Sequence, residues 1–343
     1  MKKHIYIAYT GGTIGMRPSN NGYIPARGFL SETLQKMPEF HHPEMPDFTL
    51  HEYPELIDSS NMSPSHWQQI ADDIKDHYAQ YDGFIILHGT DTMAYTASAL
   101  SFMFENLDKP VIVTGSQIPL AELRTDGQEN LLNALYIAAN YPIPEVSLFF
   151  NNRLLRGNRS RKLDADGFNA FDSPNYDALL VAGINIKVLN GQVKEPEPET
   201  QLIVSPIISQ PIGMVTLYPG ISSDVLKNTL RQPVNAMILL SYGVGNAPQN
   251  PELLNQLEEA KEKGILVVNC TQCVRGKVNM EGYATGHALH DAGVLSGMDM
   301  TPEAALAKLH YLLSQNLSVE EMRHKISESL RGELTPGVKS RAK

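Results

Sequence analysis

Short apolar runs of strand length alternate with longer segments of helical period along the first half of the chain. The runs that predict strands cover residues 4–10, 48–53, 83–89, 110–116 and 145–151. After the helix-starting pair Ser63 and Pro64, apolar residues recur on one helical face, and a similar segment begins at Asp126. This alternation is typical of parallel strands joined by crossover helices.

The pattern stops at residues 194–199, where charged residues alternate with proline and fit neither a helix nor a central strand. It restarts with strand-like runs at 212–220, 235–243 and 264–272. Further helices are predicted to begin near Ser222, Pro251, Thr301 and Ser318. The second half of the chain therefore repeats the architecture of the first.

We predict an α/β fold with two α/β domains, whose mostly parallel sheets are flanked by helices. A chain of 343 residues is long enough for two such domains. The predicted N-terminal catalytic domain is the larger and covers residues 1–190. A linker follows at 191–211, and the smaller C-terminal domain covers 212–343.

The charge of the chain limits its partners. The formal net charge is −10, so no basic surplus exists to neutralise phosphates, and we expect neither nucleic acid nor a membrane surface as a partner. No apolar run approaches about 18 residues, the length that spans a bilayer, and the N-terminal residues do not resemble a secretory signal. With only two cysteines, Cys270 and Cys273, the sequence fits a reducing cytoplasm. These two are read as ordinary thiols, with a redox C-x-x-C pair as the alternative.

The candidate chemistry lies where the predicted strands end. The first strand ends in TGGT (residues 10–13), the third in HGTDT (88–92) and the fourth in VTGSQ (113–117). Two of these ends place a threonine directly after a glycine, and one of the two adds the carboxylate of Asp91. The sequence lacks the glycine spacing of a dinucleotide loop or a P-loop. Hydroxyls beside free backbone N–H groups suit acyl transfer, in which a hydroxyl attacks a carbonyl and N–H groups hold the oxyanion.

A threonine nucleophile needs a base. His88 precedes Gly89 at a strand end, but as a lone histidine it is interpreted as structural, and no G-x-S-x-G motif occurs. A lysine can act as the base if its pKa is lowered from about 10.4 towards 7, which takes about 4 kcal/mol. Lys162 is the best-placed lysine. From spacing alone, a solvated surface is the favoured interpretation of its basic neighbourhood, which comprises Arg153, Arg156, Arg159, Arg161 and Lys162.

Two long stretches, YTGGTIGM and GFIILHGTDTMAYTA, resemble the signature regions of the L-asparaginase family, and KVNMEGYATG (277–286) is similar to a segment of its cytoplasmic, type I branch. The resemblance extends from about residue 5 to residue 334. It implies an amidohydrolase that converts L-asparagine to L-aspartate and ammonia in the cytoplasm, with neither a metal nor an organic cofactor. It also implies a homotetramer built as a dimer of dimers.

The resemblance assigns roles to individual residues. Thr13 matches the nucleophile, and Tyr23 matches the tyrosine of a loop that closes over the substrate and assists proton removal. Thr90, Asp91 and Lys162 match a second catalytic cluster, in which lysine and threonine relay a proton. Thr10 is then mostly structural.

Further residues match the substrate-binding positions and a second, allosteric site of some type I members. The substrate-binding residues are Asp58, Ser59, Ser60, Thr90, Asp91 and Ser116. The residues matching the allosteric site are Leu240, Thr271 and Cys273. Because relatives carry a cation where this chain has Leu240, we expect asparagine activation to be weak or absent. The sequence AsnAlaPro at 246–248 also departs from the asparagine and glutamate that a neighbouring protomer contributes in extracellular relatives.

Three rival functions are considered. A glutaminase-type amidotransferase subunit has similar motifs, but carries an extra domain before its TGGT motif, whereas nine residues precede Thr10 here. A non-catalytic amino-acid sensor would be free to lose the five catalytic positions, which are all filled. The third rival is a redox protein that uses Cys270 and Cys273.

Overall fold

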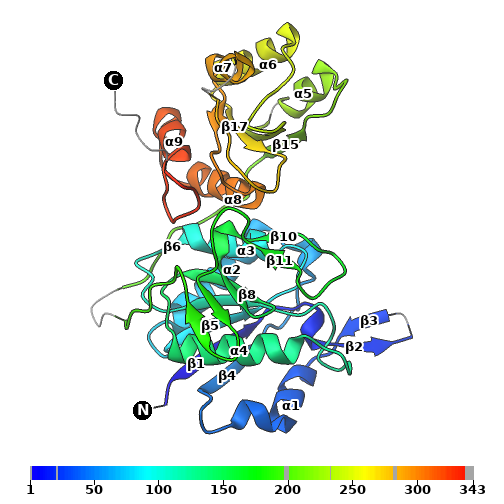
Figure 1. Cartoon of the computed structure of the whole chain (residues 1–343), viewed down its shortest axis with the longest axis vertical. Helices are drawn as coiled ribbons and strands as arrows, with labels where there is room; N and C mark the ends of the chain where they lie inside the picture. The colour runs from blue at the N-terminus through cyan, green and yellow to red at the C-terminus, as the bar shows by residue number, and fades with distance from the viewer. Residues whose placement is uncertain (1, 21, 197–200, 232, 281–283, 337–343) are drawn as a thin grey trace. The chain divides into compact units, whose positions relative to one another are not determined.

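The computed structural model describes residues 2–20, 22–196, 201–231, 233–280 and 284–336. It divides into two compact units, Met1–Ser205 and Pro206–Lys343. The division falls within residues 191–211, where the sequence predicts a linker. Each unit is an α/β sandwich with a mostly parallel sheet, so the predicted fold class is confirmed (Figure 1).

An eight-stranded sheet forms the centre of the first unit, in the order β13-β12-β9-β8-β7-β5-β1-β4. Five neighbouring strands are parallel: β4 (Asp47–Glu52), β1 (His4–Tyr9), β5 (Gly83–Leu87), β7 (Val111–Thr114) and β8 (Val146–Phe150). They match the five strands predicted from the apolar runs. Three short strands add an antiparallel edge that the sequence did not predict: β9 (Arg153–Arg156), β12 (Leu180–Ala182) and β13 (Ile186–Val188).

Helices cover both faces of this sheet. On one face, α1 (Phe29–Lys36) and α4 (Gly127–Asn140) pack on the odd-numbered residues of β1, such as Ile5 and Ile7. On the other face, α2 (Pro64–His77) stacks His77 on Tyr6, and α3 (Met93–Met103) adjoins α2. Because successive side chains of a strand point to opposite faces, the continuous apolar runs are explained by burial on both sides.

Short elements complete the first unit. The hairpin of β2 (Met16–Ser19) and β3 (Gly22–Pro25) projects from its side (Figure 1). The pair β10 (Arg161–Lys162) and β11 (Phe171–Asp172) is antiparallel, as is the pair β6 (Phe104–Glu105) and β14 (Ile203–Val204). The remaining turns are the 3₁₀ segments η1 (Thr13–Gly15), η2 (Pro38–His41), η3 (Ser59–Asn61) and η4 (Gly157–Arg159).

The second unit has four parallel strands in chain order: β15 (Ile212–Thr216), β16 (Ala236–Ser241), β17 (Leu266–Thr271) and β18 (Leu295–Ser296). Its helices are α5 (Ser223–Thr229), α6 (Pro251–Glu262), α7 (Ala284–Asp291), α8 (Pro302–Leu313) and α9 (Val319–Ile326). One apolar cluster lies on each face of the sheet. The helix predicted to begin near Ser318 is α9, and Ser318 and Glu321 form a capping box at its start, since each side chain accepts the other's backbone N–H.

Candidate active site

The carboxyl ends of four parallel strands meet at one edge of the first sheet. The last residue of β1, Tyr9, pairs with Glu52 of β4 and with Leu87 of β5, and Leu87 pairs with Thr114 of β7. This register sets the TGGT, HGTDT and VTGSQ segments side by side. In open α/β sheets the ligand site lies beyond this edge.

Glycines allow the three segments to touch. A Cβ on Gly12 would lie 2.4 Å from the backbone nitrogen of Gly89, and a Cβ on Gly89 would lie 2.3 Å from the Ser59 hydroxyl oxygen. Gly12 also has φ +92°, which side chains other than glycine rarely adopt. The turn that carries Thr13 therefore packs against His88 and Gly89, the residues that precede Thr90. Ser59 packs against Gly89 in turn.

Thr10 is held by the backbone. Its hydroxyl donates to the Leu87 carbonyl oxygen at 2.8 Å, and its N–H donates to the same oxygen at 3.1 Å. Its own carbonyl accepts the Ile57 N–H at 2.7 Å. These bonds fix the start of the TGGT turn, while Thr13, three residues on, begins η1 and is partly exposed.

Lys162 joins two of the predicted catalytic residues. Its ammonium nitrogen lies 2.9 Å from the Thr90 hydroxyl oxygen and 2.9 Å from an Asp91 carboxylate oxygen. The Thr90 side chain is buried, whereas the side chain of Asp91 is 61% exposed and open to a ligand. Thr90, Asp91 and Lys162 thus form one hydrogen-bonded cluster, although 71 residues separate Asp91 from Lys162.

The interpretation of the basic stretch as a solvated surface is wrong. Arg153 pairs with Asp172 at 2.6 Å, and Arg156 makes two bonds to Glu145 at 2.6 and 2.9 Å. Arg159 is 2% exposed and lies over a tyrosine ring. These cations are paired because β9, η4 and β10 fold back along the sheet, a non-local arrangement that the spacing of arginines does not reveal.

Gln117 is a site residue that the sequence did not predict. The Thr90 hydroxyl donates to its side-chain oxygen at 3.0 Å, while its side-chain nitrogen donates to the Gly167 carbonyl at 3.1 Å. Gln117 therefore links Thr90 to the loop that follows Lys162. The only sequence signal was its place directly after Ser116 at a strand end.

Asp126 is the N-cap residue of α4, as predicted, but its side chain bonds elsewhere. Its carboxylate accepts the backbone N–H groups of Gln117, at 3.1 and 3.0 Å, and of Ile118, at 3.1 Å, and makes no cap bond to α4. This fixes the loop after β7, on which Ser116 lies. The Ser116 hydroxyl is buried and has no hydrogen-bond partner among the described residues.

The predicted substrate-binding residues Asp58, Ser59 and Ser60 form a turn at the same edge. One carboxylate oxygen of Asp58 accepts both the N–H and the hydroxyl of Ser60, each at 2.9 Å. Ser59 is buried, and its carbonyl accepts the Thr92 hydroxyl at 2.7 Å. Asp58 and Ser60 are exposed, so their polar atoms face solvent at the mouth of the site.

Tyr23 lies on β3 of the projecting hairpin, and its side chain is 49% exposed. Partial desolvation and then interaction with the Glu122 carboxylate raise the pKa of its phenol. Among the described residues, no hydrogen bond joins Tyr23 to Thr13 or to Lys162. The structure thus gathers four of the five predicted catalytic residues around the strand ends and places Tyr23 on a neighbouring hairpin.

His88 is structural. Its Nδ1 lies 2.7 Å from the Gly89 carbonyl, so this nitrogen carries the proton, and its Nε2 lies 2.8 Å from the Thr96 hydroxyl. Thr96 in turn accepts the indole N–H of Trp67 at 3.1 Å. Burial lowers the pKa of His88 to about 4, against an opposing contribution from the Gly89 carbonyl. The neutral imidazole fixes the strand end before Thr90.

This burial predicts a pH-dependent stability. Unfolded His88 takes up a proton near pH 6.5, whereas the folded form does so only near pH 4. The unfolded state therefore binds more protons between these values. Lowering the pH from 7 to 5 should remove about 2 kcal/mol from the free energy of unfolding through this residue. Urea titrations at both pH values should show a smaller loss for His88→Gln, and an equal loss in the two proteins would contradict the assignment.

The residues that match an allosteric site lie in the second unit. Leu240, on β16, packs with the apolar cluster that contains Cys270, its partner in register. Thr271 pairs with Ser241 and donates its hydroxyl to the Gly243 carbonyl at 2.5 Å, so it faces the opposite side of the sheet. Cys273 is an exposed free thiol, and its N–H donates to the Thr271 hydroxyl at 3.0 Å. Of the type I segment at 277–286, residues 281–283 lie outside the described residues.

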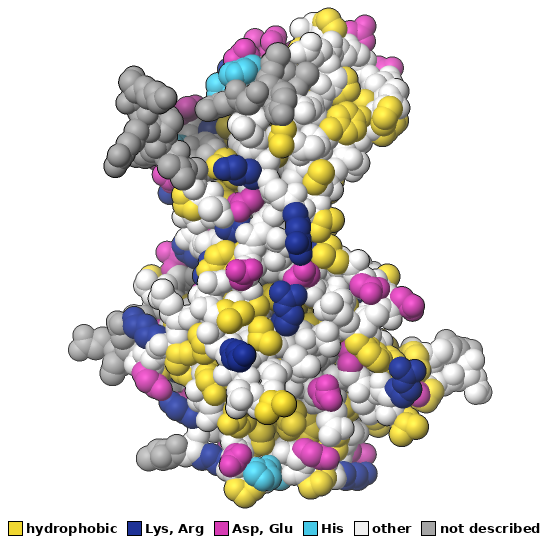
Figure 2. Space-filling view, viewed as in Figure 1, with side chains coloured by type: hydrophobic (Ala, Val, Ile, Leu, Met, Phe, Trp, Pro, Cys, Tyr) yellow, Lys and Arg dark blue, Asp and Glu magenta, His cyan; other side chains and the backbone are white. Residues whose placement is uncertain are grey.

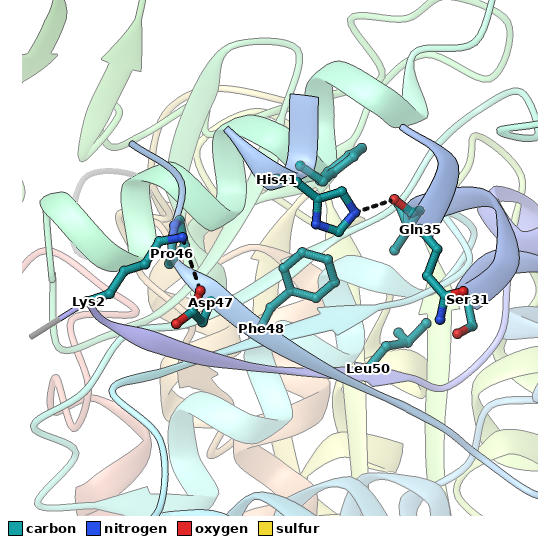
Figure 3. A pocket seen from close by; sticks show the side chains of 10 residues that line it. Lys2, Ser31, Gln35, His41, Pro46, Asp47, Phe48 and Leu50 are labelled. Carbon is teal, nitrogen blue, oxygen red and sulfur yellow. Dashed lines mark hydrogen bonds and ion pairs between the residues drawn. The ribbon is translucent and has the colours of Figure 1, made fainter. Parts of the chain in front are cut away.

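A separate pocket of about 490 Å³ lies beside the edge strand β4 (Figure 3). Phe48 and Leu50 line it from β4, Ser31 and Gln35 from α1, and His41 from η2. It contains none of the predicted site residues. We therefore place the candidate active site at the strand ends and not in this pocket.

The distribution of charged and metal-ligating side chains limits the kinds of partner the protein can bind. On the face drawn in Figure 2, lysine and arginine side chains are dispersed among acidic ones and form no broad basic area. In the part of the chain that the structure describes, no three histidine, cysteine or carboxylate side chains are grouped to hold a metal ion. Among the same residues, no helix has the length and apolarity needed to span a membrane.

Comparison with known proteins gives matches over both units. The family described as "Asparaginase, N-terminal" matches residues 4–194, and "Glutaminase/Asparaginase C-terminal domain" matches residues 211–325. L-asparaginase 1 of Escherichia coli K12 is 69% identical over 98% of this chain and 99% of its own. The crystal structure of L-asparaginase I from Vibrio cholerae, 68% identical, superposes with a TM-score of 0.91 over 98% of this chain and all of that chain.

A more distant relative bears on one rival function. The glutamyl-tRNA(Gln) amidotransferase of Methanobrevibacter smithii has a subunit that is 30% identical over 97% of this chain and 77% of its own length. That identity is less than half the value for the Escherichia coli enzyme.

Proposed function

The chain belongs to the asparaginase family, and on that premise we propose that it hydrolyses L-asparagine to L-aspartate and ammonia through a threonine acyl-enzyme. The observation that carries this proposal is the cluster of Thr90, Asp91 and Lys162 beside the glycine-lined turn of Thr13. The amidotransferase alternative is less well supported, because the matching amidotransferase chain has much lower identity to this one.

In the proposed acylation step, the Thr13 hydroxyl oxygen attacks the side-chain amide carbon of asparagine. The carbonyl oxygen becomes an oxyanion, which backbone N–H groups beside the glycines stabilise. Collapse of this intermediate breaks the C–N bond, and the nitrogen leaves as ammonia after it gains a proton. An aspartyl ester then joins the substrate to Thr13.

In the proposed deacylation step, water attacks the ester and releases L-aspartate. We assign proton relay to Lys162 and Thr90, which are 2.9 Å apart, and assistance at the Thr13 hydroxyl to Tyr23. The exposed Asp91 carboxylate is assigned to the α-ammonium of the substrate, a charge-assisted hydrogen bond. The Asp58–Ser60 turn and Ser116 are assigned to the remaining polar groups of the substrate.

We extend the proposal to assembly and regulation on the type I resemblance. The protein is proposed to act in the cytoplasm as a homotetramer, a dimer of dimers, with residues 191–211 as the linker between its domains. Asparagine activation is proposed to be weak or absent, because Leu240 packs in an apolar cluster and offers no cation for a carboxylate.

Ammonia release from L-asparagine, measured up to millimolar substrate with L-glutamine in parallel, tests this function. We expect a hyperbolic curve for asparagine and slower turnover of glutamine. A sigmoidal curve would contradict the assignment at Leu240. Turnover of neither amide would contradict the proposed hydrolysis and favour a non-catalytic sensor.

A further inference from the structure

The hairpin that carries Tyr23 is attached at both ends to one pair of residues. Tyr9 and Glu52 are the last residues of β1 and β4, and they are partners in the parallel register. Partners in adjacent strands point to the same face of a sheet. Both side chains therefore point to the same face of the sheet, and the β2–β3 hairpin projects from the side of this unit (Figure 1).

At its first end the hairpin starts over Tyr9. A Cβ on Gly15 would lie 2.1 Å from the Tyr9 hydroxyl oxygen, so that oxygen touches the backbone of the residue before β2. Gly15 closes the same three-residue turn that begins with Thr13. Tyr9 is fully buried, and its hydroxyl has no hydrogen-bond partner among the described residues. The Tyr9 phenol thus packs against the last residue of the turn that carries Thr13, at the point where β2 begins.

At its second end the chain is held by Glu52. The Gly28 N–H donates to both carboxylate oxygens of Glu52, at 3.1 and 3.0 Å. Gly28 has φ +75°, which favours glycine at this position. A hydrogen bond to a carboxylate is stronger than one between neutral groups. Glu52 therefore fixes the return of the hairpin three residues after β3 ends.

Tyr9 and Glu52, the residues at the two ends of the hairpin, also interact electrostatically. Burial, and then the Glu52 carboxylate, raise the pKa of the Tyr9 phenol. Between the attachments, the described residues of the hairpin are mostly exposed. Tyr23 also interacts with the Glu122 carboxylate, but little else buries the hairpin, so its position depends mainly on its two ends.

We propose that Glu52, together with Tyr9 beneath Gly15, is a positioning residue that holds the β2–β3 hairpin so that Tyr23 acts on the Thr13 site. This inference rests on the proposed function. It does not give Glu52 any contact with the substrate. Its effect on catalysis passes through Tyr23.

The test combines a double-mutant cycle with hydrogen exchange. Glu52→Ala should lower kcat/KM for asparagine by about 10- to 100-fold, because misplacing a catalytic group by an ångström has effects of this size. Glu52→Gln keeps one acceptor oxygen and should recover part of the loss. In the Glu52→Ala background, Tyr23→Phe should cost no more than about a further twofold, since coupled residues are not additive. If Tyr23→Phe lowered kcat/KM by the same factor in the Glu52→Ala background as in the wild type, the proposal would be overturned.

Hydrogen exchange supplies a readout that needs no activity. In Glu52→Ala, exchange of the Gly28 amide and of the described hairpin amides should accelerate, while the strands of the sheet remain protected. Asp47→Asn is the matched control, because it removes a carboxylate at the other end of β4 that pairs with exposed Lys2. Unchanged hairpin exchange in Glu52→Ala would overturn the proposal even if the wild type hydrolysed no asparagine.

Discussion

Thr13→Ala should lose about 10⁴-fold or more in kcat for L-asparagine, because removing a nucleophile also removes the covalent route it provides. The turn around Thr13 is shaped by Gly12 and Gly15, neither of which changes in this variant. We therefore expect the site to keep its shape. Calorimetric titration with L-aspartate should give an affinity close to that of the wild type, so that the loss is assigned to chemistry.

Thr13→Ser is the matched control. It keeps a hydroxyl on the same turn and should retain at least about a hundredth of the wild-type kcat. If Thr13→Ala turned over asparagine at a near-normal rate, Thr13 would not be the nucleophile. If the serine variant were as inactive as the alanine variant, while both bound aspartate, a hydroxyl at this position would not explain the activity.

Lys162→Met should lower kcat by about 10²- to 10⁴-fold, the usual range for a residue that transfers protons. The methionine keeps much of the side-chain length but cannot bond to Thr90 or Asp91, which each lie 2.9 Å from the lysine nitrogen. Steady-state ammonia release measures the loss. KM should rise as well, because Asp91 loses the partner that orients it.

Lys162→Arg distinguishes proton transfer from charge alone. Arginine supplies a cation but does not deprotonate in proteins. We expect Lys162→Arg to stay close to Lys162→Met in kcat while recovering part of the KM effect. Recovery of kcat by arginine would show that the positive charge is sufficient and would contradict the proton relay.

The sequence predicts the parallel strands well because burial on both faces leaves continuous apolar runs. The antiparallel strands β9, β12 and β13 were missed, since they are three or four residues long and their short runs give no clear period. Arg153 and Arg156 lie on such a strand and pair with carboxylates outside it. Pairing of this kind depends on tertiary contacts, and no local spacing of charges encodes it.

For the site, glycine beside threonine at strand ends indicated that the segments of Thr13 and Thr90 meet, because strand register brings such ends together, whereas the role of each threonine came from the family resemblance. The hydrogen bond between Lys162 and Thr90 could not be predicted from local spacing, because the two residues are 72 positions apart in the sequence. Gln117 had only its position after Ser116 as a signal of its role, and Glu52 had none. Those roles depend on single side-chain contacts, which become visible only in the folded structure.

The aspartyl ester at Thr13 is the intermediate on which the proposed mechanism depends. We would mix the wild-type protein with the β-methyl ester of L-aspartate, whose better leaving group favours accumulation of the acyl-enzyme, quench in acid and map the peptides by mass spectrometry. We expect an added aspartyl group on Thr13, absent in Thr13→Ala. An aspartyl group on Thr90, or steady hydrolysis of the ester with no acylated peptide, would contradict the mechanism.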